Sequence, residues 1–227
     1  MKRLLLLTFI FLSTLFFSCS PKVKERTETI YSRHLQRDVS LQVIASKPPS
    51  DKRNMHLLIW LEAEQTAIPG KKELIDSLVK QGSIQDILLV SVNGHAGSEY
   101  GIGDVAGNAR NEKADQLESF VSNELLPFVR KKAGIRKFQS VSIAGSGTAG
   151  LSALSIGWNH ANQFQATGVF GAPIDWQAEA GSDTLHYPVM AYFQSSRKRP
   201  DGRFWFLEGT GQTRALADLL QQKKFIQ

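Results

Sequence analysis

The sequence predicts a three-layer α/β fold with a mostly parallel, twisted sheet. Short apolar runs alternate with stretches of helical periodicity along most of the chain, which is the order expected when helices connect parallel strands. A length of 227 residues, 42% hydrophobic and 21% charged, suits one globular domain with a large core. No internal repeat and no low-complexity linker divides the sequence, so we expect a single domain.

The expected elements follow in order along the chain. Alternation at Val39, Leu41 and Val43 predicts a strand of an antiparallel pair, and residues 56–61 (HLLIWL) predict a buried central strand. Strands and helices then alternate to the end of the chain. The predicted ranges are helix 71–80, strand 87–92, glycine-rich loop 93–111, helix 112–133, strand 140–144, helix 149–159, strand 167–171, strand 204–208 and helix 213–224.

The first residues are typical of an export signal. Lys2 and Arg3 precede an apolar run without charge, residues 4–17, and Ser18 stands directly before Cys19. A membrane anchor that is retained is the alternative, because the uncharged stretch approaches the length needed to cross a bilayer.

Ser18-Cys19 resembles the lipobox of bacterial lipoproteins, although Phe16 stands where that motif usually has leucine. The resemblance implies that residues 1–19 are a signal segment and that Cys19 becomes the acylated first residue of the mature chain. Two or three acyl chains suffice for stable anchoring to membrane lipid. Residues 20–28 are then expected to form a tether, and the domain is expected to span residues 29–227 in the cell envelope.

Composition excludes several classes of function. A single cysteine excludes an intramolecular disulfide and a cysteine metal cluster, and no metal-ligand spacing is present, so we expect no metal and no other cofactor. The formal net charge of +6 arises from 27 basic and 21 acidic residues. Because the basic residues are scattered in short groups, such as 71–72, 130–132 and 223–224, we expect no nucleic-acid partner.

One glycine turn carries most of the functional information. Residues 141–154 (VSIAGSGTAGLSAL) join a buried strand to a helix. Gly145, Gly147 and Gly150 spell G-x-G-x-x-G, which favours dinucleotide binding by backbone N–H groups at a helix N-terminus. The context speaks against that interpretation, because several elements precede the turn and the acid expected about twenty residues further on is missing, the next being Asp175.

The same turn resembles the nucleophile elbow, G-x-S-x-G, of the α/β-hydrolases. Residues 143–154 are similar to the I-A-G-S-S-M-G-G-L-x-A-L elbow of the esterase D-like family. Further segments also fit that family's pattern, namely 88–93, 123–128, 159–164, 168–172 and 204–211. The resemblance covers the chain from about residue 29 onward, and it implies an α/β-hydrolase fold with a Ser-acid-His triad for the hydrolysis of carboxylic esters.

At the catalytic positions the sequence departs from that family. Alignment on the elbow places Gly147 at the nucleophile position and Gln212 at the acid position, so the hydroxyl and the carboxylate of the triad are both missing. The family's histidine follows one more strand, so the fold is expected to be truncated before its last strand and helix. Leu61-Glu62-Ala63 replaces the family's L-H-G segment and brings a carboxylate to the place where the oxyanion hole needs donors.

Other residues are alternatives for these roles. Ser146 would be the nucleophile if the register slipped by one, but the β-branched Thr148 would then crowd the turn. His95, in a loop after a central strand, is the histidine expected at the carboxyl edge of the sheet, although a solvated loop position would also explain it. Glu62 and Asp175 are expected along the same edge, where structural or solvated roles are the other interpretation.

The sequence therefore predicts an exported, lipid-anchored pseudoenzyme of α/β-hydrolase fold with a binding or scaffolding role. Backbone N–H groups of Thr148 and Ala149 are expected to hold a small acyl or anionic ligand. An active ester hydrolase that uses other residues and a dinucleotide-binding protein are the alternatives. The carboxyl-terminal sheet edge is expected to lack a neighbouring strand, which predicts self-association or a protein partner. The candidate ligand-binding residues are Glu62, His95, Ser146, Thr148 and Ala149.

Overall fold

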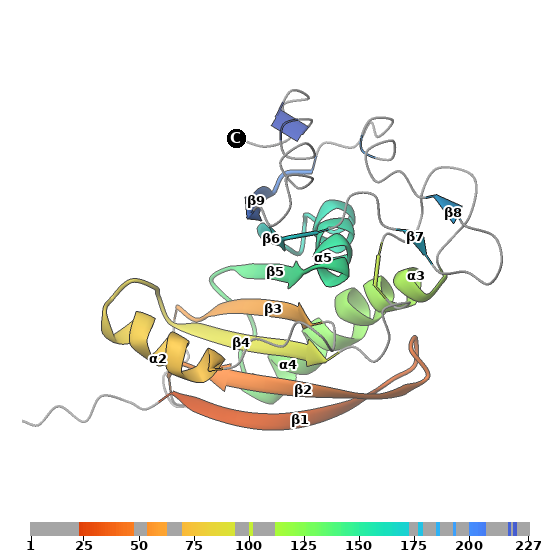
Figure 1. Ribbon diagram of the computed structural model, residues 1–227. Coiled ribbons are helices and arrows are strands. Elements are labelled where there is room, and N and C mark those ends of the chain that lie inside the picture. Colours follow the sequence, from red (N-terminus) through yellow and green to blue (C-terminus); the bar gives the residue numbers. More distant parts are fainter. Residues whose placement is uncertain are drawn as a thin grey trace, which may run out of the picture.

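A seven-stranded sheet forms the centre of the computed structural model (Figure 1). The strand order is β1-β2-β4-β3-β5-β6-β9, and a separate two-stranded sheet joins β7 and β8. The structure describes residues 23–47, 54–62, 70–93, 100–101, 112–172, 177–178, 185–186, 193, 200–207, 218 and 220–221.

Five strands of the large sheet are parallel, and two antiparallel strands extend it on one side. The strands are β1 (Lys24–Ser32), β2 (Arg37–Ala45), β3 (His56–Glu62), β4 (Ile87–Asn93), β5 (Val141–Ser146), β6 (Ala166–Phe170), β7 (Gln177–Ala178), β8 (Leu185–His186) and β9 (Arg203–Leu207). The ends of β3, β4, β5, β6 and β9 define a carboxyl edge, and their starts define an amino edge. β1 begins at the amino edge, because Lys24 pairs with Ala45 and Ala45 pairs with Leu88 near the start of β4.

Helices cover both faces of this sheet (Figure 1). α2 (Lys71–Lys80) lies on one face, where Ile75 packs in one cluster with Ile44 and Leu89. α3 (Glu112–Ser119), α4 (Leu126–Ala133) and α5 (Thr148–Asn159) contribute to the larger core on the other face. The predicted three-layer arrangement is therefore confirmed. None of the helices within the described ranges has the length and apolar character needed to cross a bilayer.

The helix predicted over residues 112–133 is divided by a π-helical segment, Phe120–Leu125. The N–H group of Leu126 donates to the carbonyl of Val121, five residues back. Pro127 follows at once and has no N–H group to continue the ordinary register, which is the physical reason for an irregularity here.

The predicted boundary between tether and domain was wrong. Residues 24–28, expected in the tether, pair with residues 41–45 as the first half of β1. Val23 is also buried, in the cluster that contains Ile44 and Leu89. β1 is an outer strand, and outer strands carry charged side chains on their solvent sides, so its polar sequence is similar to that of a tether.

β9 is the outermost strand on the side opposite β1, and β6 is its neighbour in the described sheet. Trp205 and Leu207 of β9 are 64% and 62% exposed. The helix expected over residues 213–224 lies largely outside the described residues, although Leu220 is buried. Self-association through this side of the sheet stays a prediction.

Candidate functional site

The glycine turn lies at the carboxyl edge, where β5 ends between β3 and β6 and α5 begins (Figure 1). We call residues 145–149 the elbow. Ten consecutive residues of α5, 149–158, are buried. The helix therefore lies inside the domain, and its N-terminus is fixed relative to the sheet.

Gly147 forms the tip of the elbow. Its φ of 58° and ψ of −134° lie in a region of backbone conformation that glycine occupies freely and other residues occupy under strain. Its N–H group donates to the carbonyl of Phe170 at 2.9 Å. A Cβ atom at position 147 would have no neighbour within 4 Å, so a side chain here would project into open space. Strain together with projection is what defines a nucleophile elbow.

Gly145 is required for a different reason, the close approach of the helix to the strand. A Cβ atom at position 145 would lie 2.4 Å from the carbonyl oxygen of Ala149, and one at Gly150 would lie 3.0 Å from the carbonyl oxygen of Gly145. The three glycines of the G-x-G-x-x-G pattern thus have structural roles in the elbow and in the first turn of α5.

Ser146 does not lie at the tip. It pairs with Phe170 across the β5–β6 ladder and, by the alternation of side chains along a strand, lies on the face opposite α5. Trp60 is on this face too, and its ring centroid is 5.3 Å from that of Phe170. The Ser146 hydroxyl is buried without a hydrogen-bond partner. The backbone has a positive φ at Gly147 and not at Ser146 or Thr148. The strained position of the elbow is therefore residue 147, and the backbone does not fit the alternative alignment in which Ser146 is the nucleophile.

The N-terminus of α5 presents backbone donors at the same edge. The first N–H groups of a helix have no acceptor within the helix, and they carry the positive end of its dipole. The N–H group of Gly150 donates to the carbonyl of Gly147 at 3.0 Å, and no side chain caps this helix. Those of Thr148 and Ala149 have no recorded hydrogen bond within the described part of the chain, so they are the donors available to a ligand.

Glu62 ends β3 at the carboxyl edge and is buried in an ion pair with Lys71. The Lys71 ammonium also donates to the hydroxyl of Ser91 at 3.1 Å, and the hydroxyl of Tyr100 donates to the backbone carbonyl of Glu62. The side chains of Glu62 and Lys71 are 5% and 10% exposed. The positive charge of Lys71 therefore compensates the negative charge of the Glu62 carboxylate, which the sequence predicted to lie next to the oxyanion hole.

The sequence did not indicate Lys71, Ser91 or Tyr100 as partners of Glu62. They belong to three separate segments of the chain, α2, β4 and the segment after β4, which come together only in the folded structure. The one available signal was chemical, because a carboxylate at the end of a buried strand needs a cationic partner.

His95, Asp175, Gln212 and Cys19 lie outside the described residues. Two of the described histidines, His56 and His160, lie toward the amino edge, at the end of the sheet opposite the elbow. His56 starts β3 at the amino edge, with its Nδ1 2.6 Å from the hydroxyl of Ser140. His160 follows α5, with its Nε2 2.9 Å from a carboxylate oxygen of Glu118.

His34 is in the turn between β1 and β2, and β4 and β3 separate these strands from β5. His186 is in β8 of the two-stranded sheet. Within the described ranges, no three His, Cys, Asp or Glu side chains are grouped so that they could hold a metal ion.

The family model described as "Putative esterase" matches residues 32–224. A ferulic acid esterase structure is 17% identical with a TM-score of 0.68, over 90% of this chain and 88% of that one. The enterobactin esterase of Shigella flexneri is 16% identical with a TM-score of 0.68, over 92% of this chain and 54% of that one. A ferulic acid esterase of Anaeromyces mucronatus is 12% identical with a TM-score of 0.62, and the match covers 91% of this chain and 82% of that one.

No curated protein sequence matches the chain. The structural similarity at these low identities concerns the fold, and it confirms the predicted α/β-hydrolase fold.

We predict that Lys71→Met lowers the free energy of unfolding by about 3–5 kcal/mol, because it leaves the buried Glu62 carboxylate without its counter-charge. Urea denaturation measures this change. Lys80→Met is the matched control, since Lys80 pairs with Asp76 on the exposed surface of α2 and its loss should change stability by less than about 0.5 kcal/mol. The double variant Glu62→Gln/Lys71→Met should be more stable than Lys71→Met alone. Equal effects of the two lysine substitutions would contradict the prediction.

Proposed function

The chain belongs to the putative esterase family of α/β-hydrolases, and we propose that it is a member without esterase activity that binds a small acyl or anionic ligand at its elbow. The observation that carries this proposal is the residue at the tip of the elbow. Gly147 occupies the strained, projecting position where an elbow presents its nucleophile, and it has no side chain that could attack a carbonyl.

The surroundings of the tip support the proposal. A serine nucleophile needs a base that accepts its proton. Glu62, a described carboxylate at the carboxyl edge, forms a buried ion pair with Lys71. The hydroxyl of Ser146 is buried on the face opposite α5 rather than at the tip. Its proximity in sequence therefore does not make it a replacement for the missing nucleophile.

The backbone N–H donors of the elbow determine which functional groups a ligand needs in order to bind there. The N–H groups of Thr148 and Ala149 are suited to a carbonyl or carboxylate oxygen, because they sit at the positive end of a buried helix. The similar solved structures are named as esterases of ferulic acid and enterobactin. We propose an ester or carboxylic acid group as the part of the ligand that is recognised, bound without being cleaved.

We predict that Gly147→Ser remains inactive toward p-nitrophenyl acetate and is less stable than the parent by about 1–3 kcal/mol. A serine supplies a nucleophile without a base, and its backbone is strained at this φ. Gly147→Ala is the control: since a Cβ atom here meets nothing within 4 Å, alanine should destabilise the chain as much as serine does. Hydrolysis and urea denaturation are measured on all three chains.

The outcomes of this assay separate the alternatives. Hydrolysis by Gly147→Ser well above that by Gly147→Ala, with a bell-shaped pH profile, would reveal a base such as His95 and overturn the loss of activity. Hydrolysis by the parent itself would favour an active enzyme that uses other residues. Flavin or nicotinamide absorbance in the purified parent would favour dinucleotide binding through Gly145, Gly147 and Gly150.

We predict that Thr148→Pro weakens ligand binding, because proline at the first helical position removes one N–H donor while leaving the helix intact. Thr148→Val is the matched control, since it removes the hydroxyl and keeps the backbone donor. Benzoate is the probe, and the amide signals of Ala149 and Gly150 are followed by NMR during the titration. Equal affinity of both variants for benzoate would contradict a role for this N–H group.

We also propose that an acylated Cys19 holds the domain at a membrane of the cell envelope. Since Val23 already packs in the core, three residues, 20–22, separate Cys19 from the folded domain. Three extended residues reach roughly 10 Å. The domain would thus be held close to the lipid surface, with the amino edge nearest because β1 begins there.

Mass spectrometry of the chain from the membrane fraction tests this anchor. We expect a mature terminus at Cys19 that carries acyl chains, and we expect Cys19→Ser to remain unprocessed. A terminus at Met1 in the membrane fraction would favour a retained anchor instead. A mature terminus with an unmodified Cys19 would also contradict lipidation.

A further inference from the structure

Five cations gather at the amino edge of the sheet, at the end opposite the elbow. Arg130, Lys131, Lys132, Arg136 and Lys137 fall within eight residues, and no acidic residue occurs between Glu124 and Asp175. α4 ends at Ala133, and the following segment leads into the start of β5. The fold therefore keeps all five on one edge, and we call them the basic edge.

Most of this charge is not neutralised by the protein. Lys132 forms an ion pair with Glu28 of β1, at 3.1 Å. Within the described residues, no ion pair is recorded for Arg130, Lys131, Arg136 or Lys137. Lys131, Arg136 and Lys137 are exposed, so their charges face the medium beyond this edge.

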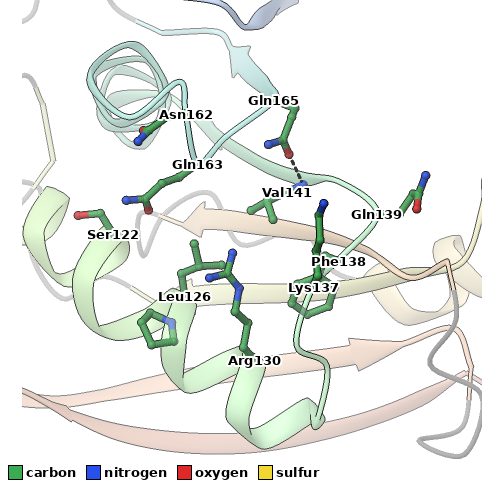
Figure 2. A pocket seen from close by; sticks show the side chains of 11 residues that line it. Ser122, Leu126, Arg130, Lys137, Phe138, Gln139, Val141, Asn162, Gln163 and Gln165 are labelled. Atoms are coloured by element: carbon green, nitrogen blue, oxygen red, sulfur yellow. Dashed lines mark hydrogen bonds between the residues drawn. The ribbon is translucent and has the colours of Figure 1, made fainter.

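A pocket of about 370 Å³ opens at the basic edge (Figure 2). Arg130 reaches into it from α4, Lys137 borders it from the segment before β5, and the amide side chains of Asn162, Gln163 and Gln165 border it from the turn between α5 and β6. Its lining contains no aspartate or glutamate. The pocket is positive and rich in hydrogen-bonding groups.

Two polar atoms of this pocket are buried without a hydrogen-bond partner, Nε of Arg130 and Oε1 of Gln163. An unpaired buried donor of a guanidinium group is unfavourable and suits an anionic oxygen. The amide oxygen of Gln163 accepts, so it needs a ligand that also has a donor. By contrast, Gln165 is already engaged, since its Oε1 accepts from the N–H group of Val141 at 2.7 Å (Figure 2).

A phosphate group next to a hydroxyl group satisfies both atoms. Guanidinium and ammonium groups bind phosphate oxygens, and a neighbouring hydroxyl can donate to the glutamine. The position of the pocket indicates the source of such a group. β1, which is separated from the proposed anchor by the four residues 20–23, begins at the same edge, and Lys132 contacts it directly through Glu28.

We propose that the basic edge is a docking surface for anionic membrane phospholipid, with one lipid phosphate bound by Arg130 and Lys137 and a headgroup hydroxyl bound by Gln163. An acyl anchor together with a polybasic surface is a combination that holds a protein firmly on a membrane. The pocket lies at the edge opposite the elbow, so this inference is independent of ligand binding there.

Calorimetric titration of the full chain in micelles of an uncharged detergent tests the proposal. The probe is dihexanoyl phosphatidylglycerol, whose headgroup has one phosphate and two hydroxyl groups, and we expect saturable binding. Arg130→Gln/Lys137→Gln should weaken that binding at least about tenfold, because two charge-assisted contacts are lost. Arg33→Gln/Lys72→Gln removes the same charge away from the basic edge and should leave the affinity unchanged.

Gln163→Leu separates a specific pocket from general charge attraction, since it changes no charge and should still weaken binding several-fold. Dihexanoyl phosphatidylcholine should not bind. Thr148→Pro should bind the phosphatidylglycerol probe like the parent, which keeps this result separate from that at the elbow. If Arg130→Gln/Lys137→Gln fails to fold, the proposal is tested with Gln163→Leu and with Lys137→Gln alone, which changes only an exposed side chain.

Three results would overturn the proposal. Equal weakening by Arg33→Gln/Lys72→Gln would mean that net charge alone attracts the lipid. Unchanged binding by Gln163→Leu would mean that the pocket is not used. Inorganic phosphate bound as tightly as the lipid would make this a site for free phosphate rather than a docking surface for a membrane.

Discussion

The close approach of α5 to β5 is the constraint on which the rest of the site depends. A Cβ atom at Gly145 would lie 2.4 Å from the carbonyl oxygen of Ala149. α5 can therefore pack this closely against β5 only because residue 145 has no side chain. The chain must then reverse within one residue, and Gly147 adopts the required conformation with a φ of 58°. The buried helix and the donors at its N-terminus both follow from this reversal.

Gly145 and Gly147 are constrained for different reasons, and the difference distinguishes what the fold requires from what catalysis would require. Position 145 is restricted by packing, whereas position 147 is restricted by backbone conformation alone, since a side chain there meets open space. A catalytic serine at the tip would have to bear a strain of about 1–3 kcal/mol. In a member without esterase activity, as proposed above, glycine at the tip would relieve that strain and preserve the backbone donors, so binding could persist without hydrolysis.

The sequence was informative where a feature depends on local pattern. The parallel strands, α2 and α5 follow from hydrophobic periodicity and glycine positions, and the fold class was correct. β1 was not foreseen because the charged solvent side of an outer strand is similar to a tether. The pairing of Glu62 with Lys71 depends on contacts between separate elements, which the sequence pattern does not reveal. The basic edge comes from one short stretch, residues 130–137, and its two groups form one surface only after the turn beyond α4 folds.

A parallel sheet has two chemically distinct edges, and this chain places different chemistry at each. The helix that follows β5 presents its N-terminal donors at the carboxyl edge, while α4 delivers its basic last turn to the amino edge. Because β1 also begins at the amino edge, an anchor at Cys19 and the basic edge would act on the same side of the domain. In that orientation the elbow faces away from the bilayer, so its ligand would reach it from the aqueous space of the envelope.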